Sequence, residues 1–235
     1  MRTMARLLTL LLLAAACGGR AFAADRNWEG GGRSGRASDR DNWAYGRLPG
    51  PSDRVVFDRR SSRDCAWDLE TEVAAFTVSE GFRGDVRFEA PLKVSGDMDV
   101  EGGVLHLKGP SLTVGRRLYI GVKGVFDLLD GTLRLGRRGL VVDGYFFSRG
   151  NAKAHIEAAV PGEYFDFSVK RGNLVVTNPA GTELNGSGGI KVARGARVEQ
   201  ADFVEIKNLK PGAAALKLAG TLGRRLDPKC WTFDG

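Results

Sequence analysis

The middle of the chain repeats itself about every twenty residues, and this repeat most constrains what the chain can fold into. Short apolar runs recur 20 to 22 residues apart, and a glycine follows close behind each run. Two sets of apolar positions carry the repeat: Leu92, Leu112 and Leu133, and Val100, Ile120 and Val142. One such unit cannot bury its apolar side chains alone, so stacked units must place like residues above one another.

Within each run, apolar and charged residues alternate, as in a strand with one buried face. Leu92-Lys93-Val94 and Leu133-Arg134-Leu135 are examples. Glycines between the runs permit sharp corners. We therefore predict an all-β fold, a single-stranded right-handed parallel β-helix (β-solenoid). It has roughly six or seven coils between Val73 and Leu222, and a loop excursion within residues 152–168. An antiparallel meander is the alternative, but it would not need glycines at a constant period.

Residues 1–23 have the three parts of an export signal. A basic start precedes the apolar run Leu7–Ala16, and the small residues Ala21 and Ala23 favour cleavage after Ala23. The run is about half as long as the roughly twenty residues that span a membrane. Ala14-Ala15-Ala16-Cys17 also resembles a lipoprotein cleavage site. A lipid anchor on Cys17 is therefore the alternative to soluble export.

Removing the signal leaves one domain in two parts. Residues 24–72 are assigned to an N-terminal cap with its first strands, and residues 73–235 to the β-solenoid with a closing C-terminal strand. Three of the 35 basic residues lie in the signal, so 32 basic residues face 28 acidic ones and the mature net charge is +4. Such a mildly basic surface suits an anionic partner, and no nucleic acid is expected.

Cleavage after Ala23 would remove Cys17 and leave Cys65 and Cys230. In an oxidising compartment these two cysteines are a candidate disulfide. The alternative is a pair of buried thiols, because a solenoid holds its two ends apart. The sequence contains no Cys-x-x-Cys pair and no Cys/His cluster, so we predict no metal site and no cofactor.

The opening stretch of the mature chain carries a set of motifs. It reads Asn27-Trp28-Glu29-Gly30-Gly31, then Asn42-Trp43, Gly46-Arg47-Leu48-Pro49-Gly50 and Asp53-Arg54-Val55-Val56-Phe57. This set resembles the opening segment of bacterial extracellular parallel β-helix surface proteins and is similar to the G8-domain pattern. The resemblance covers residues 26–150, and Cys230-Trp231-Thr232-Phe233 resembles the closing strand of the same group. It implies a capped β-helix and is a poor guide to activity, because such modules occur in adhesins and in some carbohydrate-active enzymes.

Four aromatic residues of this stretch permit two interpretations: Trp28, Trp43, Tyr45 and Trp67. They could form a platform on which sugars stack, or they could cover the first coil. Their positions in the resemblance favour the cover. The open end of a solenoid needs one, since it exposes unpaired strand edges.

The sequence lacks nucleophile-elbow, zinc-protease and phosphate-loop motifs, and its two histidines, His106 and His155, match no triad pattern. Acidic residues near turns are the one enzymatic feature to consider, since β-helix lyases and hydrolases use such groups. The candidates are Asp97, Asp99, Asp127, Asp130 and Asp143. Their spacing fixes no catalytic pair, so solvated turn residues are the preferred interpretation.

Paired arginines follow two adjacent apolar runs, as Arg116-Arg117 and Arg137-Arg138. Stacked coils would set these four guanidinium groups on one corner, about 5 Å apart between coils. Such like charges repel unless acidic neighbours or an anionic ligand compensate. Arginine also suits carboxylate, sulfate and phosphate groups. We treat the four arginines as a candidate anion-binding ridge, and a solvated basic edge is the alternative.

The sequence thus predicts an exported protein, which is secreted, periplasmic or on the cell surface. Its expected role is binding, adhesive or structural, with an anionic polysaccharide or cell-envelope polymer as partner. The alternative is a small carbohydrate-active β-helix enzyme, a lyase or hydrolase acting on an acidic polysaccharide. Membrane contact is expected only through a lipid on Cys17.

Overall fold

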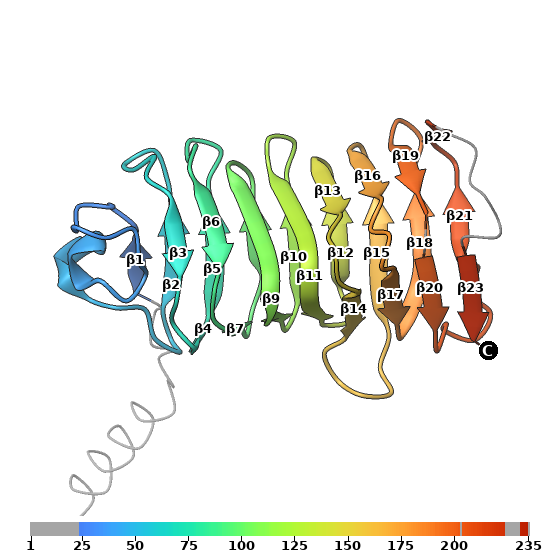
Figure 1. Cartoon of the computed structure of the whole chain (residues 1–235), viewed down its shortest axis with the longest axis horizontal. Coiled ribbons are helices and arrows are strands. Elements are labelled where there is room, and N and C mark those ends of the chain that lie inside the picture. Colours follow the sequence, from blue (N-terminus) through green and yellow to red (C-terminus); the bar gives the residue numbers. More distant parts are fainter. Residues whose placement is uncertain (1–23, 203, 224–230, 235) are drawn as a thin grey trace, which may run out of the picture.

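The computed structural model describes residues 24–202, 204–223 and 231–234, the last range by its backbone alone. These residues form an all-β parallel β-solenoid of about eight coils (Figure 1), so the predicted fold class is confirmed. The helical elements described are two short 3-10 turns in the cap, η1 (Arg40–Asn42) and η2 (Ala44–Gly46). Among the described residues, no helix is long and apolar enough to cross a membrane.

Each coil passes over three faces, which we call A, B and C. Face A is a nine-stranded parallel sheet. Its strands are β1 (Asp25–Asn27), β2 (Arg54–Phe57), β5 (Ala75–Val78), β8 (Met98–Val100), β10 (Arg117–Ile120), β12 (Gly139–Val142), β15 (Phe165–Val169), β18 (Ser187–Val192) and β21 (Leu216–Leu218). The seven strands from β5 to β21 match the number of coils predicted after Val73.

Faces B and C are joined into one fourteen-stranded sheet, because β9 (Val104–Val114) and β11 (Val125–Leu135) turn the corner between them. The remaining strands of face B are β3 (Cys65–Trp67), β6 (Asp85–Phe88), β13 (Tyr145–Ser148), β16 (Asn173–Val176), β19 (Arg197–Ala201) and β22 (Thr221–Leu222). Those of face C are β4 (Thr71–Val73), β7 (Leu92–Val94), β14 (Ala154–Ala158), β17 (Thr182–Asn185), β20 (Val204–Lys207) and β23 (Trp231–Asp234).

The residues that define the repeat are stacked in register. The pairs are Leu92 with Leu112, Leu112 with Leu133, Val100 with Ile120, and Ile120 with Val142. All six side chains are buried inside the solenoid. Burying one such side chain stabilises the fold by about 1.5–3 kcal/mol. Together with the buried aromatic side chains of other coils, these stacked residues form a continuous core along the solenoid.

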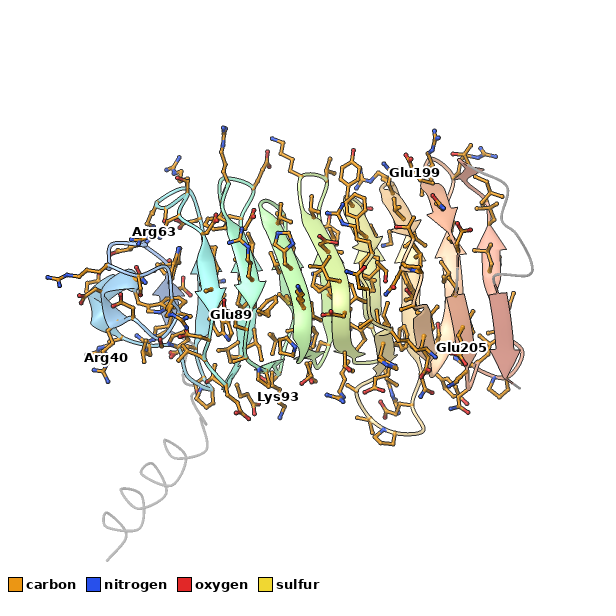
Figure 2. All side chains as sticks on the ribbon, viewed as in Figure 1. Arg40, Arg63, Glu89, Lys93, Glu199 and Glu205 are labelled. Atoms are coloured by element: carbon orange, nitrogen blue, oxygen red, sulfur yellow. The ribbon has the colours of Figure 1, made fainter. Side chains whose placement is uncertain are left out.

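The cap covers the first coil with three tryptophans. Trp28, Trp43 and Trp67 are at most 2% exposed, and Trp43 meets the other two rings edge-on. Tyr45 alone of the four aromatic candidates is exposed, so the interpretation as a cover is correct for the tryptophans. Figure 2 labels Arg63 beside this cap, where its guanidinium donates hydrogen bonds to the carbonyl oxygens of Gly30 and Arg33 and so ties the cap to the loop that precedes β3.

The predicted loop excursion is present and narrower than expected. Residues 159–164 connect β14 to β15 and extend from the lower edge of the stack in Figure 1. The loop lies at the corner where the chain leaves face C for face A. This corner also carries three of the four arginines of the candidate ridge, Arg116, Arg137 and Arg138.

Candidate anion-binding site

The corner between faces C and A begins at a glycine in two consecutive coils. Gly136 N donates a hydrogen bond to Val114 O at 2.8 Å, one residue before Gly115 in the coil beneath. A Cβ on Gly136 would lie 2.0 Å from Gly115 O, so the two glycine backbones are in direct contact. The arginines that follow them, Arg116 and Arg137, therefore lie one coil apart on the same corner.

Four basic side chains line one shallow depression of about 430 Å³ at this corner: Lys93, Arg116, Arg137 and Arg138. They come from three consecutive coils. Figure 2 shows Lys93 on the lower edge of the stack, from which the 159–164 loop also extends. Glu163, on that loop, is the acidic residue among those lining the depression. The site therefore carries a clear excess of positive charge.

Acidic neighbours compensate the arginines only in part. Arg137 Nη2 lies 2.8 Å from Glu163 Oε1, and this hydrogen bond raises the pKa of Arg137. Arg116 Nε is 3.9 Å from Asp97 Oδ1, which is at the limit of an ion pair. Arg138 is exposed, and within the described residues no carboxylate pairs with it. Arg116 and Arg138 are thus the guanidinium groups best placed for an external anion.

Lys93 is a member of the site that the sequence prediction missed. Its ammonium lies 3.0 Å from Glu72 Oε2 on face C, and both side chains are well exposed. The sequence repeat could have indicated it, because Lys93 is the outward-facing residue of the run Leu92–Val94. Lys93 pairs with Thr113 in the next coil, and Thr113 pairs with Arg134 in the coil after that. That column of outward residues runs directly beside the corner.

Arg117, the fourth arginine predicted, is placed elsewhere. It is the first residue of β10 and pairs in register with Gly139 rather than with Arg138. Its Nη2 lies 2.8 Å from Asp99 Oδ1, and its guanidinium stands 5.4 Å from the centre of the Tyr119 ring. Three of the four predicted arginines are therefore brought together, and the fourth belongs to the ion pairs of face A.

The acidic candidates are mostly engaged with basic groups. Asp143, which is buried, accepts a hydrogen bond from Tyr119 at 3.0 Å and lies 3.3 Å from Arg171. Asp97 and Asp99 face Arg116 and Arg117, as described above. Asp130 differs, because no basic group pairs with it among the described residues, and its Oδ1, like Asp143 Oδ1, is buried there without a hydrogen-bond partner.

Asp127 is the centre of a charged cluster on face B. It is 2% exposed by its side chain, and Arg149 donates to both carboxylate oxygens at 3.0 and 2.9 Å. His106 Nδ1 lies 3.3 Å from Asp127 Oδ2, and His106 Nε2 lies 3.4 Å from Asp85 Oδ2. Burial raises the pKa of Asp127, but the hydrogen bonds from His106 and Arg149 outweigh it and the net shift is downward. This carboxylate is held ionised.

The second histidine, His155, stands on face C with its Nδ1 3.6 Å from Glu183 Oε1. Glu183 also faces Lys153 and Lys207, at 3.2 and 3.0 Å. Among the described residues, no group of three or more His, Cys, Asp or Glu is placed to hold a metal ion.

Of the cysteines, Cys65 has no exposed surface and no disulfide partner among the described residues, and burial raises the pKa of its thiol well above the usual value. Cys17 and Cys230 lie outside the described residues, as does the predicted signal of residues 1–23. The disulfide and the lipid anchor therefore stay predictions.

Comparisons of the chain with protein-family models, with curated proteins and with solved structures found no match. The resemblance to extracellular β-helix proteins and to the G8-domain pattern consequently rests on the motifs alone.

Proposed function

We propose that this protein is an exported, non-catalytic β-solenoid that binds anionic glycans at the cell surface or in the cell envelope. One observation carries the proposal: basic side chains from three consecutive coils, Lys93, Arg116, Arg137 and Arg138, line a single depression. A carboxylate, sulfate or phosphate group there would relieve the repulsion between these cations. Guanidinium groups hold such anions through paired hydrogen bonds.

An extended polymer fits the shape of this corner better than a compact ligand. Equivalent residues of neighbouring coils are spaced by about 4.8 Å, so the cations follow one another along the stack. The depression is open to solvent and does not enclose a ligand as a small-molecule pocket does. A linear polysaccharide can lie along such an edge and contact several cations at once.

The acidic residues give less support to the enzymatic alternative. A glycoside hydrolase needs two carboxyl groups that face one bond from opposite sides, with one of them protonated. Asp127 is held ionised by Arg149, and Asp143 is bound to Arg171 and Tyr119. The export proposal rests on the pattern of residues 1–23. The mass of the purified protein distinguishes a chain beginning at Ala24 from one lipidated on Cys17.

The test is binding of the mature chain, from Ala24, to immobilised acidic polysaccharides at low and physiological salt. We expect the triple variant Arg116→Gln, Arg137→Gln, Arg138→Gln to lose at least tenfold in affinity, since each charge-assisted hydrogen bond contributes about 1.5–3 kcal/mol. Binding should also weaken as salt rises.

A matched control removes the same charge from the corner between faces A and B. Arg59, Arg83 and Arg194 are exposed there, and the variant with all three changed to Gln should bind as the parent does. Equal losses in the two variants would mean that net charge alone attracts the glycan. No binding by the parent protein would refute the proposal.

A further inference from the structure

The 159–164 loop has a second depression on its other side. This one has a volume of about 580 Å³ and is lined by residues of face C, of the corner that follows face C and of the loop itself, about half of them polar. The lining residues used below are Arg134, Glu157, Glu163, Tyr164, Asn185 and Asn208. We call it the amide pocket, after its two asparagines.

The amide pocket is polar but nearly uncharged, in contrast to the basic corner. Arg134 Nε lies 2.7 Å from Glu157 Oε1, so these two charges cancel. Glu163 is the other charged lining residue, and it is bound to Arg137 at 2.8 Å. A second anionic group would find no free cation here among the described residues. The pocket therefore suits a neutral ligand group with many hydrogen-bonding positions.

Two asparagines supply unused hydrogen-bonding groups. Asn208 Nδ2 donates to Asn185 Oδ1 at 2.9 Å. This bond leaves Asn185 Nδ2 as a donor and Asn208 Oδ1 as an acceptor without a partner among the described residues. Tyr164 adds a half-buried ring and a hydroxyl from the loop. The planar amides can exchange hydrogen bonds with the hydroxyl groups of an uncharged sugar. The aromatic ring can pack against the C–H face of the same sugar.

The amide pocket and the basic corner flank one loop. Ala159 and Glu163 line both depressions, and Arg137 reaches the loop through its ion pair with Glu163. A chain lying along this corner of the solenoid would pass from one depression directly into the other. Its successive units would then meet a cationic and a neutral environment in turn.

We propose that the amide pocket binds an uncharged sugar unit next to the charged unit held at the basic corner. This inference rests on the proposed function and narrows it. The ligand would be a polysaccharide in which acidic and uncharged sugars alternate, rather than one that is acidic at every unit.

The experiment compares two hexasaccharides by titration calorimetry. Unsulfated chondroitin alternates glucuronate with N-acetylgalactosamine, whereas hexagalacturonate is charged at every unit. The pocket variants are Asn185→Ala and Asn208→Gly. Glycine suits position 208 because Asn208 has a φ of 48°. The control is Asn173→Ala, which changes an asparagine on face B of the coil that holds Asn185.

We expect each pocket variant to weaken chondroitin binding roughly five- to tenfold, the effect of one lost net hydrogen bond. Hexagalacturonate binding should change less than about twofold, which is within the scatter of neutral surface changes. The arginine triple variant should weaken both ligands. An unchanged thermal midpoint would confirm that each variant is folded.

Three outcomes would overturn the inference, and they are distinguishable. If both oligosaccharides bind and the asparagine variants weaken neither, the amide pocket takes no part and the basic corner stands alone. If the variants weaken both ligands equally, the pocket does not select uncharged units. If neither ligand binds to the parent protein while other acidic glycans do, alternation is not what the site recognises.

Discussion

His106 lies between two carboxylates on the outer surface of face B. The hydrogen bond to Asp127, opposed by partial burial, raises the pKa of His106, and Asp85 adds to the shift. Its neighbour across the sheet, Arg87, is itself paired with Asp85 and Asp64. A histidine whose pKa is higher in the folded state than its unfolded value of about 6.5 stabilises the fold when protonated.

The stability due to His106 should therefore be fully present below about pH 6.5 and lost as the pH rises through the folded-state pKa. We expect the free energy of unfolding, measured in urea, to fall between pH 6 and pH 8. In His106→Gln this fall should be smaller, because glutamine does not titrate. An identical pH dependence in the variant would show that other groups cause it.

The paired arginines show which residue positions the sequence could predict and which it could not. The recurrence of Gly-Arg-Arg correctly placed Arg116 and Arg137 on one corner. It could not place Arg117, because the next coil has one more residue at this corner and Arg117 pairs with Gly139. A difference of one residue in corner length moves a side chain from the corner into the strand, and spacing alone does not reveal it.

At the scale of the strand and its corners, the glycines set how closely the coils approach. A Cβ on Gly136 would lie 2.0 Å from a backbone oxygen of the coil beneath, which cannot move without displacing its strand. We expect Gly136→Ala to cost about 2–4 kcal/mol, a large effect for a single methyl group.

The control is Gly50→Ala in the cap. A Cβ there would have its nearest neighbour, Asp53 Oδ2, at 3.6 Å, and the backbone is not in the left-handed region. Urea unfolding of the two variants should show a large loss for Gly136→Ala and almost none for Gly50→Ala. Similar losses of stability in the two variants would mean that the close contact between coils is not the reason for glycine at position 136.

The strands themselves were largely predictable, whereas the three faces were not. Alternation identified runs such as Leu92–Val94 because one side of each strand is buried. The corner between faces B and C is hidden in β9 and β11, which continue through it as unbroken strands. Lys108 and Asp130 pair there with a shift of register, and no residue pattern in the sequence predicts this irregularity.

Over the whole molecule, the near-constant number of residues per coil predicted the stack in the first half of the solenoid. In the second half the coils differ in length, so the repeat is harder to detect in the sequence. Leu118 pairs with Leu140, 22 residues later, whereas Leu140 pairs with Phe167, 27 residues later. The 159–164 loop accounts for the longer coil, and it separates the two depressions of the candidate site. The 159–164 loop, which interrupts the repeat, thus also shapes the surface of the candidate site.

A solenoid buries each coil only against its neighbours, so its stability should vary along the stack. Leu128 lies in a central coil, pairs with Leu107 and Ser148 on either side, and has no exposed surface. Leu218 lies in the last coil on face A and is 38% exposed. Leu128→Ala should cost about 2–5 kcal/mol, and Leu218→Ala less than about 1 kcal/mol, in urea unfolding of the mature chain. Equal costs would mean that another part of the protein, or a second copy, covers the last coil.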